Sequence, residues 1–258
     1  MARSGAACHL AAQPPIGADC DGEDPGALRA GREGTGEDVH FIRAAALLAA
    51  WVGLAGLAAP VAAAEFKVDG ERLYVSGAIY GRHEFETMSK LVRDNPKVSI
   101  VVMKDFYGGT AGTAGFFNFT KFIRDRKLAT EVDGACFSAC AVAFMGGVRR
   151  SVSPKADPQK SFVAFHGAYF GGGQPDHEFR STFVSALRRY SGGKMPELVA
   201  RIAYAMPPEG FLLFLDPRKA KPKDGISVIA CKSKKEVETG GCTGITDIDS
   251  RKVGVFTH

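Results

Sequence analysis

Ser138 is the residue of this sequence whose type and surroundings best suit chemistry. It lies four residues after Gly134, among small neighbours, at the start of an apolar run long enough for a short helix. A serine there would hold its hydroxyl at the positive end of the helix dipole, among backbone N–H groups that have no partner within the helix. Such a place suits a nucleophile, and it equally suits a serine that only caps the helix.

The segments on either side of the serine carry further polar groups. Residues 98–103 have the apolar composition of a buried strand and lead into Gly108, Gly109 and Thr110, a glycine loop between strand and helix. Residues 161–167 form another expected strand, which ends in His166 and a glycine. The chain therefore offers a hydroxyl, an imidazole and loop N–H groups, which are the parts that acyl transfer by a serine requires.

Hydrophobic spacing predicts alternating strands and helices along most of the chain. Asp69-Gly70 marks a turn between the first two strands, and Asn95-Pro96 ends the first helix. Apolar strands that alternate with helices are typical of an α/β fold with a mostly parallel sheet. The expected strands cover residues 65–68, 72–77, 98–103, 128–132, 161–167 and 226–230, and the expected helices cover residues 82–94, 113–126, 178–190 and 196–205.

The order strand, Gly-Gly loop, helix, strand, serine, helix, strand, histidine resembles the ClpP/crotonase-like superfamily. Within it, the chain is most similar to small exported Clp-peptidase-like proteins that carry a C-x-S-x-C sequence around the serine. The resemblance covers roughly residues 73–226 and is specific mainly at Gly108-Gly109, Ser138 and His166. It implies an α/β fold, a ClpP/crotonase-like spiral of β-β-α units with a mostly parallel sheet.

The resemblance also implies a role for each polar group. Ser138 would be the nucleophile and His166 the general base, while the N–H groups of Gly109 or Thr110 and of Ala139 would form the oxyanion hole. Without the resemblance, His166 would be interpreted as a core histidine, because nothing in its spacing brings it to the serine. The resemblance implies no cofactor and no metal.

The acid that should orient the histidine is the point at which this sequence departs from the peptidase pattern. An alignment on residues 214–217, which needs a gap, brings Glu209 to the position of the family's aspartate. Asp216 is the alternative, although its place before Pro217 suits a helix N-cap. A Ser-His dyad without an acid is a further alternative, and so is a catalytically inactive relative that only binds peptides.

These assignments predict an exported serine hydrolase, a peptidase that cleaves peptide bonds through an acyl-enzyme. Acyl-CoA chemistry is not expected, because an exported protein meets no CoA pool. The alternative is a non-catalytic binding or scaffold protein in the periplasm or at the membrane.

The expected partners are a peptide or protein substrate and further copies of the chain. A homo-oligomer is expected because the helix at residues 178–190 resembles the oligomerising arm of the Clp peptidases. The net charge is +5, and no basic run is long enough to form a nucleic-acid patch. A nucleic-acid partner is therefore not expected.

The first 64 residues differ from the rest. Residues 1–40 are rich in Gly, Ala, Pro and acid, which predicts disorder, unless the true chain starts further on. Residues 41–64 form an expected signal peptide, because 44–64 carries no charge and its Ala-x-Ala ending suits cleavage before Glu65. An uncleaved anchor in the inner membrane is the alternative, since residues 44–64 are long enough to span a bilayer. Residues 65–258 would form one periplasmic or secreted domain.

Four cysteines follow the expected cleavage site, and an even number in an exported chain favours disulfides. Cys231 and Cys242 bracket a hydrophilic segment, which suits a hairpin closed by a disulfide. Cys136 and Cys140 flank the serine, and a bond between them needs a turn that brings their Cα atoms within about 4.4–6.8 Å. The alternative is two free buried thiols. A zinc site is less favoured, since the spacings contain no C-x-x-C pair.

Overall fold

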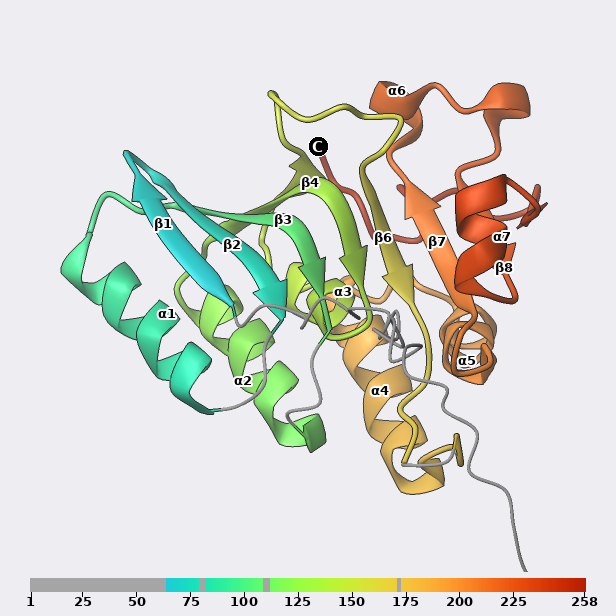
Figure 1. Cartoon of the computed structure of the whole chain (residues 1–258), viewed down its shortest axis with the longest axis horizontal. Coiled ribbons are helices and arrows are strands. Elements are labelled where there is room, and N and C mark those ends of the chain that lie inside the picture. The colour runs from blue at the N-terminus through green and yellow to red at the C-terminus, as the bar shows by residue number, and fades with distance from the viewer. Residues whose placement is uncertain (1–63, 79–81, 109–111, 171–172) are drawn as a thin grey trace, which may run out of the picture. The chain divides into compact units, whose positions relative to one another are not determined.

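The computed structural model describes residues 64–78, 82–108, 112–170 and 173–258 (Figure 1). The expected extension, the leader up to residue 63, Gly109 and Thr110 lie outside these residues. Within the described ranges, no helix is both long and apolar enough to cross a membrane.

A nine-stranded sheet carries the fold, in the order β1-β2-β3-β4-β6-β7-β8-β9, with β5 paired to β4. The strands β2 to β6 pair in parallel, while β1 at one edge and β7, β8 and β9 at the other pair antiparallel. The expected α/β class is thus confirmed, with the parallel strands at the centre. The strand bounds are β1 Glu65–Asp69, β2 Arg72–Ala78, β3 Ile100–Tyr107, β4 Ala129–Phe137, β5 Arg150–Val152, β6 Phe162–Phe165, β7 Phe211–Leu215, β8 Val228–Cys231 and β9 Thr243–Gly244.

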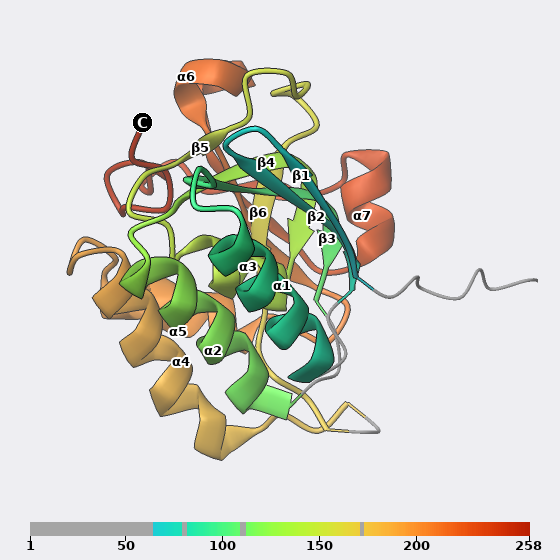
Figure 2. The same cartoon turned by 90° about the vertical axis from the view of Figure 1, so that its left-hand side faces the viewer.

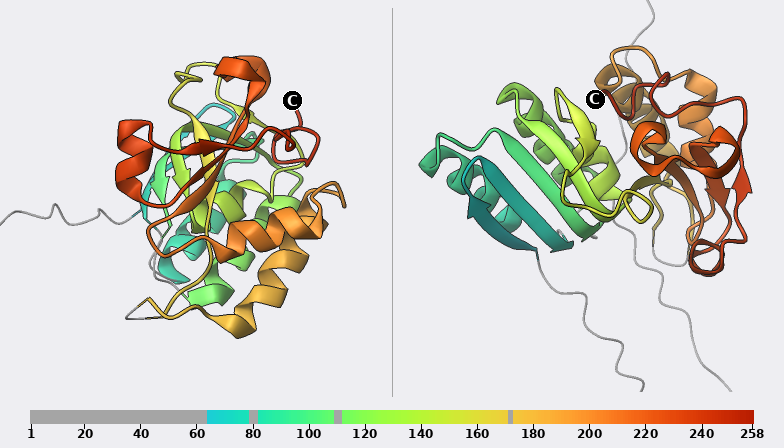
Figure 3. Two further views of the ribbon diagram at one scale, coloured as in Figure 1. Left: turned by 90° about the vertical axis from the view of Figure 1, so that its right-hand side faces the viewer. Right: turned by 90° about the horizontal axis from the view of Figure 1, so that it is seen from above.

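Helices cover one face of this sheet, and a short helix lies on the other. Helices α1, α2, α4 and α5 lie on the same side of the strands, whereas α7 lies on the opposite side beside β8 (Figures 2 and 3). The helix bounds are α1 Arg82–Asp94, α2 Gly112–Asp125, α3 Ala139–Phe144, α4 His177–Tyr190, α5 Glu197–Ala205, α6 Pro217–Ala220 and α7 Lys234–Thr239, and Lys223–Gly225 forms a 3-10 turn.

The main core lies between the sheet and the helical layer. Alternate strand residues point into it, since side chains along a strand alternate between the two faces. Phe106 of β3, Phe165 of β6 and Phe214 of β7 are fully buried there against the helices. A second apolar cluster on the opposite face joins Phe137, Phe162 and other side chains to Val237 of α7.

Several expected elements are confirmed and others are wrong in extent. Helix α1 has the expected bounds, because its amphipathic spacing and the Asn95-Pro96 stop are both local signals. The strand expected at residues 128–132 continues to Phe137. The expected disulfide-closed hairpin is present, because β8 pairs antiparallel with β9, and its loop contains α7, whose first turn is capped by Ser233. Strands β5 and β7 were not expected from the sequence.

A bulge just before the ends of β3 and β4 directs both strands toward the candidate site. Asp105 has φ 41° and Gly134 has φ 90°, and the β3–β4 register shifts between Lys104 and Phe106. The Asp105 carboxylate accepts a hydrogen bond from the Ala135 N–H at 3.1 Å. A side chain at Gly134 would collide with that carboxylate, since an added Cβ would lie 2.1 Å from Oδ1. Glycine is therefore required at this point of the bulge.

Candidate functional site

Ser138 joins β4 to α3 in a backbone conformation that few serines adopt. Its φ is 56° and its ψ is −114°, and the hydroxyl makes no capping hydrogen bond to the helix. The interpretation of Ser138 as a plain N-cap is therefore wrong. A non-glycine residue in such a region costs on the order of 1–3 kcal/mol, and strain of this kind is concentrated at functional sites.

Backbone hydrogen bonds and a disulfide hold this turn. The Ser138 N–H donates to the Ala164 carbonyl at 2.8 Å, and the Val142 N–H donates to the Ser138 carbonyl at 3.2 Å. Cys136 and Cys140 are joined, with a Cα–Cα distance of 5.2 Å. The structure therefore places the serine between the two half-cystines, in the pairing that the sequence favours.

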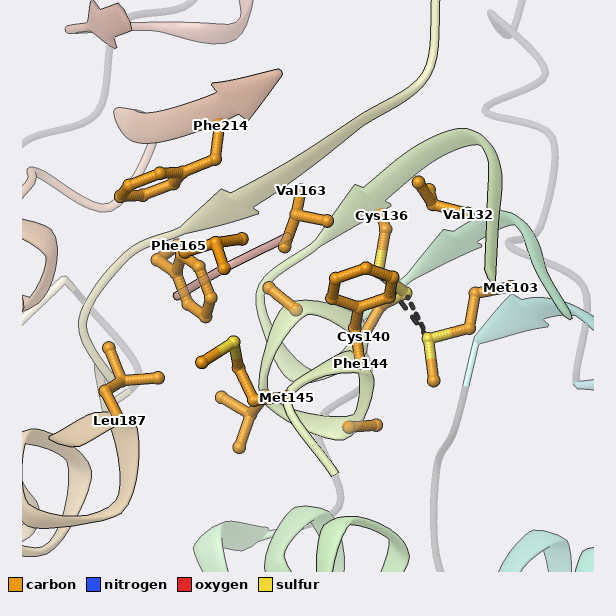
Figure 4. Packing of buried hydrophobic residues seen from close by; sticks show 14 of the residues in the cluster. Met103, Val132, Cys136, Cys140, Phe144, Met145, Val163, Phe165, Leu187 and Phe214 are labelled. Carbon is orange, nitrogen blue, oxygen red and sulfur yellow. Dashed lines mark hydrogen bonds between the residues drawn. A yellow bond between two sulfur atoms is a disulfide. The ribbon is translucent and has the colours of Figure 1, made fainter. Parts of the chain in front are cut away.

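Both half-cystines are fully buried in the core, where they lie beside Met103 (Figure 4). Their sulfur atoms lie 3.8 and 3.5 Å from the Met103 sulfur. Since a disulfide carries no hydrogen, these are packing contacts. The turn therefore rests on β3 as well as on its own covalent link.

Gly108 lies directly against the serine. A Cβ added at Gly108 would stand 2.6 Å from the Ala139 nitrogen and 2.9 Å from Ser138 Oγ. Any larger residue would therefore fill the space beside the hydroxyl and the first N–H of α3. That N–H belongs to the first turn, whose donors have no partner within the helix. Of the expected oxyanion donors, Ala139 lies at the serine, while Gly109 and Thr110 lie outside the described residues.

His166 follows β6, the strand that pairs with β4. Its ring centroid lies 6.1 Å from that of Tyr169, nearly parallel, and 4.9 Å from that of Phe211, edge to face. The residue is half-buried, but Nδ1 is enclosed and has no hydrogen-bond partner in the described structure. Burial lowers the pKa of His166 to about 4. The ring is therefore neutral at physiological pH.

The serine and the histidine lie at the carboxyl ends of neighbouring parallel strands. Phe137 pairs with Ala164, so each chain leaves the ladder at the same edge of the sheet. No hydrogen bond joins Ser138 Oγ to His166 in the described part of the chain. Catalytic hydrogen bonds are often long before substrate binds. The arrangement therefore brings the two residues to one edge without joining them.

Neither candidate acid contacts the histidine. Glu209 lies just before β7, at the end where His166 leaves β6, but it is exposed and makes no described bond to that ring. Asp216 lies at the other end of β7, where Leu215 pairs with Phe162. There Asp216 accepts a hydrogen bond from the Arg218 N–H at 3.1 Å and pairs with Arg251 at 3.5 Å. Asp216 therefore caps α6, as its sequence position suggests.

The second disulfide lies at the other end of the strand order, between β8 and the segment before β9. Cys231 at the end of β8 is joined to Cys242, with a Cα–Cα distance of 4.5 Å. The bond encloses α7 and fixes it to the sheet. Among the described residues, no group of three or more His, Cys, Asp or Glu side chains could hold a metal ion.

Sequence reasoning missed the aromatic side chains around the histidine. The sequence does contain a signal for Tyr169, because this tyrosine follows His166 by three residues. Phe211 gave no such signal, since only the pairing of β6 with β7 brings it to the ring.

Comparison with known proteins gives only distant similarities. No protein-family model and no curated protein matches the chain. It is similar to a variant of the 1510-N membrane-bound stomatin-specific protease, with 12% identity and a TM-score of 0.36 over 67% of this chain and 85% of that one. It is also similar to an enoyl-CoA hydratase from Polaromonas sp. JS666, with 14% identity and a TM-score of 0.33 over 55% and 63% of the two chains.

A third similarity is to a putative enoyl-CoA hydratase/isomerase from Acinetobacter baumannii, with 15% identity and a TM-score of 0.27 over 38% of this chain. The chain spans about half of that protein, 51% of its length. The similar structures thus include a protease as well as enoyl-CoA hydratases. They identify no activity for this chain.

Proposed function

We propose that this chain is an exported serine hydrolase of the Clp-peptidase-like type, which cleaves peptide bonds through an acyl-enzyme on Ser138. The observation that carries the proposal is the backbone of Ser138, with φ 56° and a hydroxyl that makes no capping bond. A serine that only capped a helix would not require this strain.

In this mechanism the neutral His166 imidazole takes the proton of Ser138 Oγ as the oxygen attacks the substrate carbonyl carbon. The negative charge that develops on the carbonyl oxygen would be stabilised by the Ala139 N–H, the first donor of α3. The imidazolium then gives its proton to the leaving amine. Water, activated by the same histidine, hydrolyses the ester and releases the serine.

One observation favours a second function, a peptide-binding protein without catalysis. In the described structure no carboxylate contacts His166, and no hydrogen bond joins it to Ser138. Such a protein would use the same edge of the sheet to bind peptides and would not turn them over.

Turnover of an unfolded protein substrate by the purified protein separates these two functions. We expect peptide release to fall by about 10³-fold or more in Ser138→Ala and in His166→Ala, because nucleophile and base act as a unit. Ser99→Ala, at an exposed serine just before β3 and at the opposite end of the parallel strands from Ser138, is the matched control and should retain full activity. Binding of the substrate without any release would favour the peptide-binding protein.

Export to an oxidising compartment is part of the proposal. Two disulfides support it, because they persist mainly outside the cytosol. The first described strand begins at Glu65, the residue that would follow cleavage. Amino-terminal sequencing of the protein from its native host should begin at Glu65, whereas a product that retains Trp51 would contradict cleavage.

A further inference from the structure

His166 needs something other than a carboxylate to fix its ring. Among the described residues, Glu209 is exposed and makes no bond to it, and Asp216 lies at the far end of β7. Nδ1, the atom that an orienting acid would contact, is enclosed and unpartnered. An unrestrained imidazole would lose the orientation on which proton transfer depends.

Tyr169 covers one side of the imidazole. The two rings are stacked with an angle of 17° between their planes. The tyrosine ring is itself fixed at both ends, because its hydroxyl donates a hydrogen bond to the Met206 carbonyl and its backbone pairs with Pro175. Tyr169 therefore offers a rigid surface to the histidine.

Phe211 contacts the imidazole from β7. Its ring meets His166 at 65° and 4.9 Å, and it also lies 4.8 Å from the ring of Phe137. Phe137 directly precedes Ser138 in the chain. A single aromatic ring therefore touches both the expected base and the residue next to the expected nucleophile.

We propose that Tyr169 and Phe211 are positioning residues that hold His166 from two sides, in the place of the acid of a Ser-His-acid triad. This inference rests on the proposed function and adds to it the means by which the base is oriented. It also implies a cost, because two apolar surfaces that exclude water lower the basicity of the imidazole. The expected enzyme is slow, and it remains active in mild acid.

The titratable groups around His166 are uncharged at neutral pH. Tyr169 faces it from the following loop, and burial raises the pKa of that phenol, so it is neutral. Tyr204 of α5 lies beyond Tyr169, and its pKa is raised to about 12, chiefly by burial. Phe211, which contacts the ring from β7, carries no charge. Burial alone therefore lowers the pKa of His166.

The test measures two quantities in the purified protein: the rate of fluorophosphonate labelling against pH, and the His166 pKa by NMR titration. Tyr169→Ala and Phe211→Leu should slow labelling at pH 7 by roughly tenfold or more, because the base is no longer aligned. Both should also move the His166 pKa toward its ordinary value of about 6.5. Tyr169→Phe keeps the ring but loses the hydrogen bond to the Met206 carbonyl, so it should change both values in the same direction as Tyr169→Ala and by less.

Phe162→Leu is the matched control, because Phe162 contacts Phe137 on the same face of the sheet at 5.2 Å but makes no described ring contact with His166. It should leave labelling and the His166 pKa unchanged. Unchanged values in folded Tyr169→Ala and Phe211→Leu would overturn the proposal. Should those variants fail to fold, the wild-type titration decides, since a His166 pKa near 6.5 would show that the rings do not enclose it.

The two proposals fail in different ways. A wild-type protein that is never labelled would count against the hydrolase. If the His166 pKa still rose in Tyr169→Ala and Phe211→Leu but not in Phe162→Leu, the aromatic rings would nevertheless hold the histidine.

Discussion

At the scale of single residues, the serine turn depends on what is missing beside it as much as on the serine itself. Gly108 has no side chain, and its backbone packs closely against Ser138 and the Ala139 nitrogen. Because an added Cβ would lie closer than 3 Å to both groups, even alanine forces the turn to move. A substitution at position 108 therefore tests directly how far activity depends on the geometry of the serine turn.

We predict that Gly108→Ala slows fluorophosphonate labelling by about 10²-fold, because the added methyl group collides with Ser138 Oγ and the Ala139 nitrogen and displaces both from their positions. The free energy of unfolding should fall by about 1–3 kcal/mol, as expected for a small overpacked site. Labelling kinetics and urea unfolding measure the two effects. Gly241→Ala is the control, since a Cβ there would meet only ordinary contacts at 3.6 Å. Equal labelling rates in Gly108→Ala and Gly241→Ala would contradict the role assigned to Gly108.

The histidine predicts a pH dependence of stability with a definite sign. Between about 6.5 and about 4, the unfolded chain binds a proton at His166 and the folded chain does not. Stability should therefore be full above pH 6.5 and fall as pH drops toward 4, by at most about 3 kcal/mol from this group. Urea unfolding at pH 7 and 4.5 measures the fall. His166→Gln should show a shallower fall, and the same slope in both proteins would refute it.

The candidate site was predictable where its signals are local. Ser138, its two flanking cysteines and His166 stand in short recognisable segments, and the structure places them around one turn and one sheet edge. The contacts of Phe211 and the engagement of Asp216 with Arg251 depend on strand pairing and on the carboxyl-terminal segment. A single sequence contains no direct signal for either.

At the scale of elements, the β4–α3 turn is closed by its own covalent link. Cys136 pairs with Val163 of β6, next to the last pair of that ladder, and Cys140 lies in the first turn of α3. The bond excludes any conformation in which β4 would continue extended past the serine. We infer that its role is to preorganise the turn, since both sulfurs are buried and unavailable to solvent.

The two disulfides provide matched variants. Chain entropy assigns about 2 kcal/mol to the five-residue loop and about 3 kcal/mol to the twelve-residue loop. We therefore predict that Cys136→Ala/Cys140→Ala and Cys231→Ala/Cys242→Ala lose comparable stability in urea. Only the first pair should lose labelling, by roughly tenfold or more. Equal labelling by the two double variants would mean that the bond beside Ser138 is merely structural.

The elements that the sequence analysis missed share a physical cause. β4 was expected to end at Val132 because Asp133 and Gly134 look like a loop, yet they form a bulge within the strand. β7 is a short apolar run whose type only its two antiparallel neighbours decide. Helix α1 needed no such context, because its amphipathic spacing and its stop lie within the segment itself.

At the scale of the whole molecule, assembly is the prediction that most affects access to the site. Helix α4 buries Phe183, Val184 and Leu187 in its own core, so it is not a free arm. Its outward face borders an open groove of about 480 Å³ beside α2, lined by Ser181, Ser185 and other residues. We propose that copies of the chain associate. Light scattering at micromolar concentration should give a multiple of about 20 kDa for the cleaved chain, and a clean monomer would contradict it.

The most direct test of the central claim is the site of a fluorophosphonate adduct, located by mass spectrometry of peptides from the purified protein. We predict one adduct, on Ser138, which disappears in Ser138→Ala and forms far more slowly in His166→Ala. An adduct that survives Ser138→Ala, or a folded wild-type protein that never acquires one, would show that Ser138 is not the nucleophile.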